Sequence, residues 1–218
     1  MKKETISIIY KVLVALCLLT GILLNVINTS SITAILSYYT LQSNIICLAM
    51  FIEIIAIMIL YKEYRFSDIY YILKGGITIA ILITIITYQV ALVPNNFHMD
   101  VVYTTNTDRY WANLFVHIIS PIMVIGDYIL FDEKGNFKLY YPFIWLCIPL
   151  YYVLYVYIYS AKGGHFYGIG GSRKFAYIFL DYNQIGYAGV AKAIAIIVML
   201  ILLIAYGLVF LDKRMKHK

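Results

Sequence analysis

The chain has 218 residues, of which 63% are hydrophobic and 13% are charged. An ordinary soluble domain has about 25% charged residues, so composition and the long apolar segments exclude a water-soluble class. The net charge of +6 does not require nucleic acid as a partner, because basic residues that flank membrane helices contact anionic lipid.

Six apolar runs predict an all-α, polytopic membrane protein, a single six-helix transmembrane domain over residues 1–218. Each run can cross a hydrocarbon core of about 30 Å at about 1.5 Å per helical residue. None alternates polar with apolar residues, as the strands of a membrane barrel do. In chain order, the predicted spans are approximately Ile6–Ile27, Leu36–Tyr61, Gly75–Val93, Trp111–Phe131, Pro142–Ser160 and Tyr187–Leu211.

The basic residues predict the orientation of the bundle. With the N-terminus in the cytoplasm, twelve lysines and arginines fall inside and four outside, while Lys192 lies within the sixth span. This positive-inside bias predicts that both termini face the cytoplasm. We expect the protein in the cell (inner or plasma) membrane. The inside group includes Lys11 and Lys74, and most of the basic residues are expected to be cytoplasmic anchors that face anionic lipid. The first run is expected to be a retained helix, with cleavage near Asn28 as the alternative.

The cysteines and the outer segments add little chemistry. Cys17, Cys47 and Cys147 fall within spans at spacings that fit neither a metal site nor a disulfide framework, so we expect no metal and no cofactor. The two longer outer segments, residues 94–110 and 161–186, are expected to form lids or re-entrant caps over one end of the bundle.

Polar side chains gather near the outer ends of the second and fourth spans. Thr40 is expected about 6 Å below the start of the second span, and His117 about 9 Å below the start of the fourth. Ser43 and Asn44 follow Thr40 at helical spacing, and Asn113 precedes His117 by four residues. The spacing therefore predicts two polar stripes in one membrane layer. The alternative for such residues is hydrogen bonding between helices.

Pro121 strengthens the interpretation of this layer as a site. It cannot donate a hydrogen bond to the carbonyl of His117, so we expect a kink and a cavity beside the histidine. Glu53 and Asp127 lie deeper and are expected to form structural pairs, Glu53 with Lys192 or a tyrosine. The alternative for Asp127 is an interfacial anchor, because it lies close to the inner loop. Tyr151, on the tyrosine-rich face of the fifth span, is expected to line the site with its hydroxyl.

Several segments resemble a known family of membrane proteins. They are "YYTLQSN", "WANLFVHIISPIMVIGDYILF", "PFIWLCIPLYYVLYVYI" and "AYIFLDYNQIGY", in this order between about Tyr38 and Tyr187. Together they resemble the Pr6Pr family, bacterial relatives of the androgen-induced, FAR-17a-like proteins. Animal members of the wider family are intramembrane threonine hydrolases that cleave fatty acid esters of hydroxy fatty acids. The resemblance matches their catalytic threonine and histidine with Thr40 and His117.

The resulting hypothesis is a hydrolase of a lipid or amphiphilic ester, with Thr40 as nucleophile and His117 as base. Asn44 or Asn113 would stabilise the oxyanion, with Ser43 beside them. Asp181 would orient the imidazole or hold the outer loop, and the loop role is favoured. The alternative is a non-enzymatic small-solute transporter, channel or lipid-binding membrane protein. In that case a polar path would continue through Glu53 and Asp127 to the cytoplasm.

Overall fold

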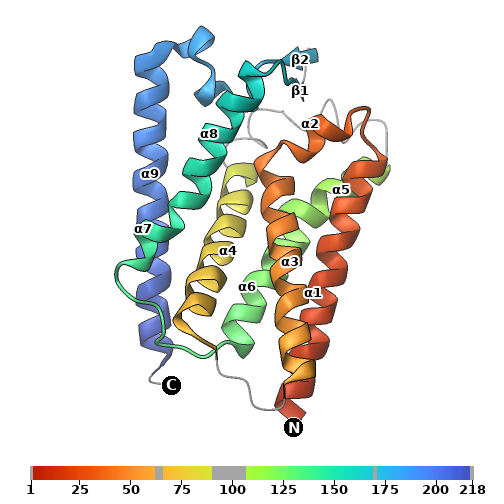
Figure 1. Cartoon of the computed structure of the whole chain (residues 1–218), viewed down its shortest axis with the longest axis vertical. Helices are drawn as coiled ribbons and strands as arrows, with labels where there is room; N and C mark the ends of the chain where they lie inside the picture. Colours follow the sequence, from red (N-terminus) through yellow and green to blue (C-terminus); the bar gives the residue numbers. More distant parts are fainter. Residues whose placement is uncertain (1, 62–65, 90–106, 169–170, 217–218) are drawn as a thin grey trace. The chain divides into compact units, whose positions relative to one another are not determined.

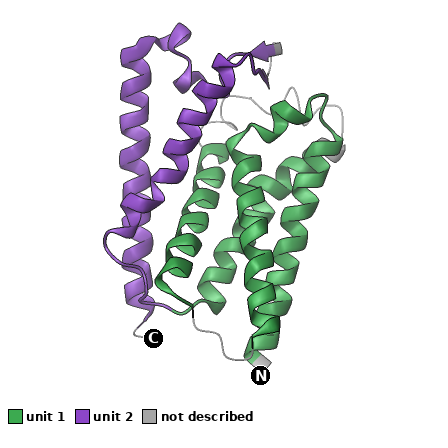
Figure 2. Ribbon diagram, viewed as in Figure 1, with its two compact units in different colours: residues 1–133 green, residues 134–218 purple. Residues whose placement is uncertain are grey.

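The computed structural model describes residues 2–61, 66–89, 107–168 and 171–216. The chain divides into two compact units, unit 1 over residues 1–133 and unit 2 over residues 134–218 (Figure 2). Within the described residues, six helices are long and apolar enough to cross a membrane. The protein is therefore an all-α, multi-pass membrane protein, as the composition predicts.

Unit 1 contains four of the spanning helices. Three of them are α1 (Lys2–Ile27), α3 (Tyr39–Leu60) and α4 (Asp68–Thr87). The fourth helix is made of three consecutive elements: α5 (Thr107–Leu114), the π-helical turn η4 (Phe115–Ile119) and α6 (Ser120–Phe131). In this unit α1 packs against α3, α5 and α6, and α4 packs against α3 and α6 (Figure 1). The short helix α2 (Ile32–Leu36) joins α1 to α3, and the Ser31 hydroxyl caps its first turn.

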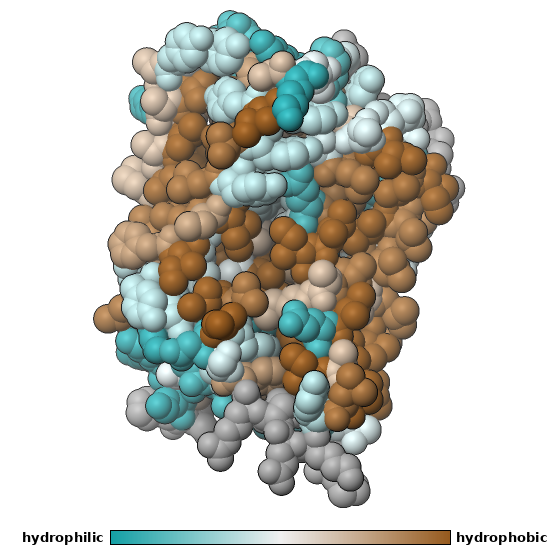
Figure 3. All heavy atoms as spheres, viewed as in Figure 1, coloured by the Kyte–Doolittle hydropathy of each residue, from teal (hydrophilic) through white to brown (hydrophobic). Residues whose placement is uncertain are grey.

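The centre of unit 1 is a hydrophobic cluster shared by these four helices. Val14 and Leu18 come from α1, and Val124 comes from α6. The other buried members are Cys47, Met50, Phe51, Ile54 and Met58 in α3 and Ile77 and Ile81 in α4. Other large apolar side chains on the same helices are exposed, such as Leu16 and Ile52. An apolar outer surface of this kind suits contact with lipid tails, and hydrophobic residues cover much of the visible flank in Figure 3.

Unit 2 contains the other two spanning helices. The short helix α7 (Tyr141–Trp145) leads into α8 (Cys147–Ala161), and the two together make the fifth span. A two-stranded antiparallel hairpin follows, with β1 (Phe166–Gly168) paired to β2 (Gly171–Arg173), and then a 3₁₀ turn, η5 (Ile178–Leu180). The last helix, α9 (Tyr182–Met215), is kinked at Gly186, whose φ of +68° favours glycine.

The predicted spans agree with these helices except at some ends. The third helix begins at Asp68 instead of Gly75, so Lys74 lies inside it, and the last helix extends from Tyr182 to Met215. The predicted outer cap at residues 161–186 contains the hairpin and the 3₁₀ turn. Most of the other predicted cap, residues 94–106, lies outside the described residues.

Candidate functional site

The structure brings Thr40 and His117 together in unit 1. Thr40 Oγ1 lies 3.4 Å from His117 Nε2, although the two residues are 77 positions apart in the sequence. Each residue is 7% exposed, so the pair is almost completely buried. Thr40 stands in the first turn of α3 and His117 in the π-helical turn. Their approach agrees with the prediction that both lie in one membrane layer.

The π-helical turn around His117 has an identifiable local cause. Pro121 has no backbone N–H, so the carbonyl of His117 receives no hydrogen bond from the residue four positions later. The N–H of Ser120 instead donates to Phe115 O, five residues earlier, which widens the helix. The sequence predicts a kink here, and the structure has a π-helical turn, a form often found at functional sites.

A small hydrogen-bond network fixes the Thr40 side of the pair. Asn44 Nδ2 donates to Thr40 O at 2.7 Å and to Val116 O at 3.1 Å, so it ties α3 to the π-helical turn. Ser43 Oγ donates to Thr40 O at 3.0 Å and lies 3.2 Å from Thr84 Oγ1 of α4. Both amide hydrogens of Asn44 are thus used, and its amide has none left for an oxyanion.

Close packing holds the His117 side in place. The ring of Tyr88 lies 4.3 Å from the imidazole, measured between centroids. On the opposite helix, a Cβ built on Gly21 would meet Val116 Cγ1 at 2.8 Å and Phe115 Cβ at 3.0 Å. The absence of a side chain at Gly21 therefore lets α1 approach the π-helical turn. Asn25 Nδ2, one turn further, donates to Ala112 O at 3.0 Å.

Two buried polar atoms near the pair have no hydrogen-bond partner within the described part of the chain. They are Asn44 Oδ1 and Ser120 Oγ. Ser120 is fully buried and follows His117 by three residues on the same helix. No role is predicted for Ser120 from the sequence, although its spacing of three residues from His117 is a usable signal.

The other predicted site residues are not all part of this network. Asn113 lies half-buried in α5, one turn before His117. Asp181 caps α9, where its carboxylate accepts from Asn183 N at 3.0 Å and Gln184 Nε2 at 2.9 Å; this is the favoured loop role. Tyr151 belongs to unit 2, is 62% exposed and contacts Tyr155, 6.5 Å away between ring centroids.

A second polar cluster, which sequence reasoning missed, lies at the opposite end of unit 1. Asp127 is fully buried and accepts from two ammonium groups, Lys11 Nζ at 2.8 Å and Lys74 Nζ at 2.5 Å. Lys74 also lies 3.4 Å from Asp132 Oδ2. We call Lys11, Lys74, Asp127 and Asp132 the ion cluster. The anchor role predicted for most of the basic residues does not apply to Lys11 and Lys74, because both are buried as partners of Asp127. The structural pairing predicted for Asp127 is confirmed.

The carboxyl of Asp132 has a perturbed pKa. Burial raises the pKa of Asp132 above its ordinary value, the positive charge of Lys74 lowers it, and the negative charge of Asp127 raises it. The charge of Lys11 and the hydrogen bond from Tyr70 also lower the pKa of Asp132. Burial is the largest effect, so the net shift is upward. The proton of Asp132 is thus held more tightly than that of an exposed aspartate.

The two polar layers are separated by the hydrophobic cluster. In α1, Val14 and Leu18 lie between Lys11 and Gly21, and in α3, Cys47, Met50, Phe51 and Ile54 follow Asn44. In α4, Ile77 and Ile81 lie between Lys74 and Thr84, and in the fourth helix Val124 lies between His117 and Asp127. The hydrophobic cluster therefore lies between the Thr40–His117 layer and the ion cluster on each helix. In α4 it also includes one buried polar residue, Thr78, whose hydroxyl donates to Lys74 O at 2.8 Å.

The predicted partnership of Glu53 is not seen. Glu53 is exposed in α3, and no hydrogen bond or ion pair involves it in the ranges that the structure describes. The tyrosines of α8 do share a face as predicted, with Tyr155 stacked on Tyr159. Across the described residues, no group of three or more His, Cys, Asp or Glu side chains could hold a metal ion.

The fold and the site together define a class: a multi-pass α-helical membrane protein with a threonine–histidine pair buried near one end of a four-helix unit. Comparisons with protein-family models, curated proteins and solved structures find no match. The similarity to the Pr6Pr family therefore stays an expectation from the sequence motifs.

Proposed function

We propose that the protein is an intramembrane hydrolase of lipid esters in which Thr40 and His117 form the catalytic pair. The observation that carries the proposal is the approach of Thr40 Oγ1 to His117 Nε2 at 3.4 Å inside a buried polar layer. A hydroxyl beside an imidazole is the arrangement that activates a weak oxygen nucleophile. A distance slightly longer than a tight hydrogen bond is common in sites without substrate.

In the proposed reaction His117 takes the hydroxyl proton of Thr40 through Nε2, so the neutral imidazole carries its own hydrogen on Nδ1. Thr40 Oγ1 then attacks the ester carbonyl carbon and forms a tetrahedral oxyanion. His117 returns the proton to the departing alkoxide, which leaves as the free hydroxy compound. Water, deprotonated by His117, hydrolyses the acyl-threonine and restores both side chains.

The oxyanion needs a hydrogen-bond donor that is not otherwise engaged. Asn44 does not meet this need, because both of its amide hydrogens bond to backbone carbonyls. Asn113 and Ser120 are the better candidates, one turn before and about one turn after His117 on the same helix. The Ser120 hydroxyl is buried with no partner among the described residues, which suits a donor that acts only during the reaction.

The alternative function as a transporter or channel has less support. A solute path needs polar side chains through the thickness of the membrane. In unit 1, the hydrophobic cluster divides the two polar layers on all four spanning helices. The hydrophobic cluster below Thr40 and His117 suits instead an amphiphilic ester, whose acyl chain can stay in an apolar environment while its carbonyl meets the pair.

The test is ester hydrolysis by the full-length protein in lipid nanodiscs. A panel should include fatty acid esters of hydroxy fatty acids, acylglycerols and phospholipids, with released fatty acid measured by mass spectrometry. We expect turnover of at least one ester class by the wild type. Thr40→Ala and His117→Ala should each lower the rate on the order of 10³-fold or more, whereas Thr40→Ser should keep part of the activity because it keeps the hydroxyl.

Two matched controls distinguish the pair from a general effect of the substitutions. Thr33→Ala removes an exposed threonine of α2, and His165→Ala removes a histidine of unit 2. Both variants should hydrolyse the ester at the wild-type rate. Equal rates for the wild type and Thr40→Ala, or no turnover of any ester, would contradict the proposal.

A further inference from the structure

Glu53 is an ionisable side chain on the lipid-facing surface of a spanning helix. It is exposed in α3, and among the described residues no hydrogen bond or ion pair involves it. It lies seven residues before Leu60 at the end of α3, about 10 Å at 1.5 Å per residue. It follows Tyr39, at the other end, by fourteen residues, or about 21 Å. Glu53 is therefore inside the hydrocarbon core and not at its edge.

The nearer end of α3 gives the Glu53 side chain no easy route to water. Side chains of an α-helix lean toward its N-terminus, and for Glu53 the N-terminus of α3 is the more distant end. Neighbours on this surface are apolar, with Ile52 56% and Ile59 63% exposed. An ionisable side chain at this depth is costly, and such residues in membrane proteins almost always have a polar partner.

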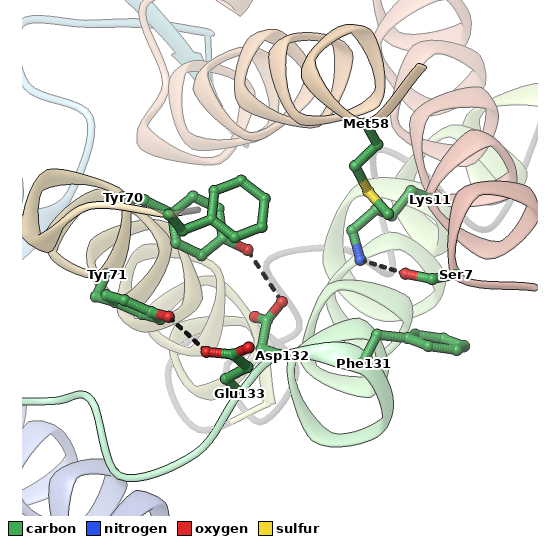
Figure 4. A pocket seen from close by; sticks show the side chains of 9 residues that line it. Ser7, Lys11, Met58, Tyr70, Tyr71, Phe131, Asp132 and Glu133 are labelled. Atoms are coloured by element: carbon green, nitrogen blue, oxygen red, sulfur yellow. Dashed lines mark hydrogen bonds between the residues drawn. The ribbon is translucent and has the colours of Figure 1, made fainter. Parts of the chain in front are cut away.

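The basic side chains of the described spans do not supply this partner. Lys11 and Lys74 both bond to Asp127, and Lys11 stands in the wall of the pocket drawn in Figure 4. Lys192 lies 23 residues before the end of α9, about 35 Å along that helix, against about 10 Å for Glu53 in α3. Because α3 and α9 are the second and sixth spans, they cross the membrane in the same direction. Lys192 is therefore at a different depth from Glu53, in a second copy of the chain as well.

Small residues stand one turn before and one turn after Glu53. Ala49 precedes it by four positions and Ala56 follows it by three, and both are exposed on the same side of α3. Ile45 and Leu60, 38% and 74% exposed, continue this line of residues. We call Ile45, Ala49, Glu53, Ala56 and Leu60 the Glu53 stripe. Small residues let two helices approach closely in lipid, and polar side chains between them hydrogen-bond across the interface.

We propose that the Glu53 stripe is the interface of a homodimer in which α3 of one copy packs in parallel against α3 of a second copy. A two-fold axis along the membrane normal places both Glu53 side chains at the same depth. When the two carboxyl groups share a proton, the protonated one donates a hydrogen bond to the other. Ala49 and Ala56 allow the close approach that this bond requires. A second copy thus supplies the depth, the donor and the packing, and the proposal does not depend on ester hydrolysis.

The test is the association of full-length copies, each with a fluorophore at the C-terminus, in vesicles of phosphatidylcholine and phosphatidylglycerol. Single-molecule photobleaching counts the copies that associate as the protein is diluted in lipid. We expect dimers at a high protein-to-lipid ratio and monomers on dilution. Glu53→Leu should raise the dissociation constant about tenfold or more. Glu53→Gln should stay within about threefold of the wild type, because an amide also donates and accepts hydrogen bonds.

Further variants assign the association to the Glu53 stripe. Ala56→Ile adds bulk at the close approach and should also raise the dissociation constant. Ala195→Ile is the matched control at an exposed alanine of α9 and should leave the dissociation constant unchanged. Glu53→Leu should keep Cys47 protected from a maleimide, which shows that unit 1 is folded.

Three results would overturn the proposal. The first is a monomer at every protein-to-lipid ratio, which would leave a helix of a different membrane protein as the partner of Glu53. The second is a dimer whose dissociation constant is unchanged in Glu53→Leu. The third is an effect of Ala195→Ile as large as that of Ala56→Ile.

Discussion

Replacement of Asp127 by asparagine should destabilise unit 1 more than replacement of either lysine partner. Asp127 receives hydrogen bonds from Lys11 at 2.8 Å and Lys74 at 2.5 Å, and the side chains of both lysines are at most 3% exposed. Asp127→Asn leaves these two buried ammonium groups with Asp132 as the remaining carboxylate of the cluster. Breaking a buried ion pair by removing one partner costs about 3–5 kcal/mol, so we expect a loss in that range.

Lys11→Met removes one of the two ammonium groups and leaves Asp127 paired with Lys74. The loss should be smaller, about 1–3 kcal/mol, the cost of a buried acceptor without its donor. The double variant Lys11→Met, Asp127→Asn restores the formal charge balance between Lys74 and Asp132. It should therefore be more stable than Asp127→Asn alone, a coupling that independent sites would not show.

Cys47 provides the assay, because it is fully buried in the hydrophobic cluster of unit 1. With Cys17 and Cys147 replaced by alanine, the reaction of Cys47 with a maleimide during SDS titration reports the opening of unit 1. Glu4→Gln serves as the control and should unfold at the wild-type SDS fraction. Two results would refute the assigned role of the ion cluster. One is an unfolding free energy of Asp127→Asn within about 1 kcal/mol of the wild-type value. The other is a double variant that is no more stable than Asp127→Asn alone.

Three further predictions follow from other contacts. Gly21→Ala should lower the stability of unit 1 by about 1–3 kcal/mol and should also lower the rate of ester hydrolysis, because the new Cβ would lie 2.8 Å from Val116 Cγ1. Unchanged Cys47 reactivity and unchanged activity would contradict the close approach of the two helices. Asp181→Ala should cost about 1 kcal/mol of unit 2 stability through the lost cap of α9, measured by thermal circular dichroism against Asp181→Asn. Burial raises the pKa of Asp132 above its ordinary 3.8, so its contribution to stability falls as pH rises through the raised value. The stability of Asp132→Asn relative to the wild type should thus increase as the pH rises from the ordinary pKa of 3.8 toward the raised pKa, and a difference independent of pH would contradict the shift.

The spanning helices were predictable because length and hydropathy are local properties of the sequence. The meeting of Thr40 and His117 was also predictable, since both lie a few residues inside helices that enter from the same end, and each residue adds about 1.5 Å of depth. The π-helical turn was predicted only as a kink. Pro121 shows that a hydrogen bond is lost, but the close packing of the widened turn against Gly21, 95 residues before Val116, is a contact between distant segments that the sequence does not reveal.

The ion cluster was not predictable from the same reasoning. Lysines near the ends of spans are ordinarily surface anchors, and Asp127 lies 116 residues from Lys11 in the sequence. The burial of Lys74 explains why the third helix begins at Asp68, because a neutralised lysine can stand inside a spanning helix. The sequence also could not show that both amide hydrogens of Asn44 are used. The carbonyl of Val116 becomes a partner of Asn44 only when α3 meets the π-helical turn.

The most direct measurement of the central claim is the site of covalent labelling by a lipophilic phosphonate that reacts with activated hydroxyl groups. Peptide mass spectrometry of the labelled wild type should place the adduct on Thr40. His117→Ala should lose the label while its Cys47 stays protected, which shows that the variant is folded. An adduct on Ser43 or Ser120 instead, or equal labelling of wild type and His117→Ala, would contradict the assignment of Thr40 as a nucleophile activated by His117.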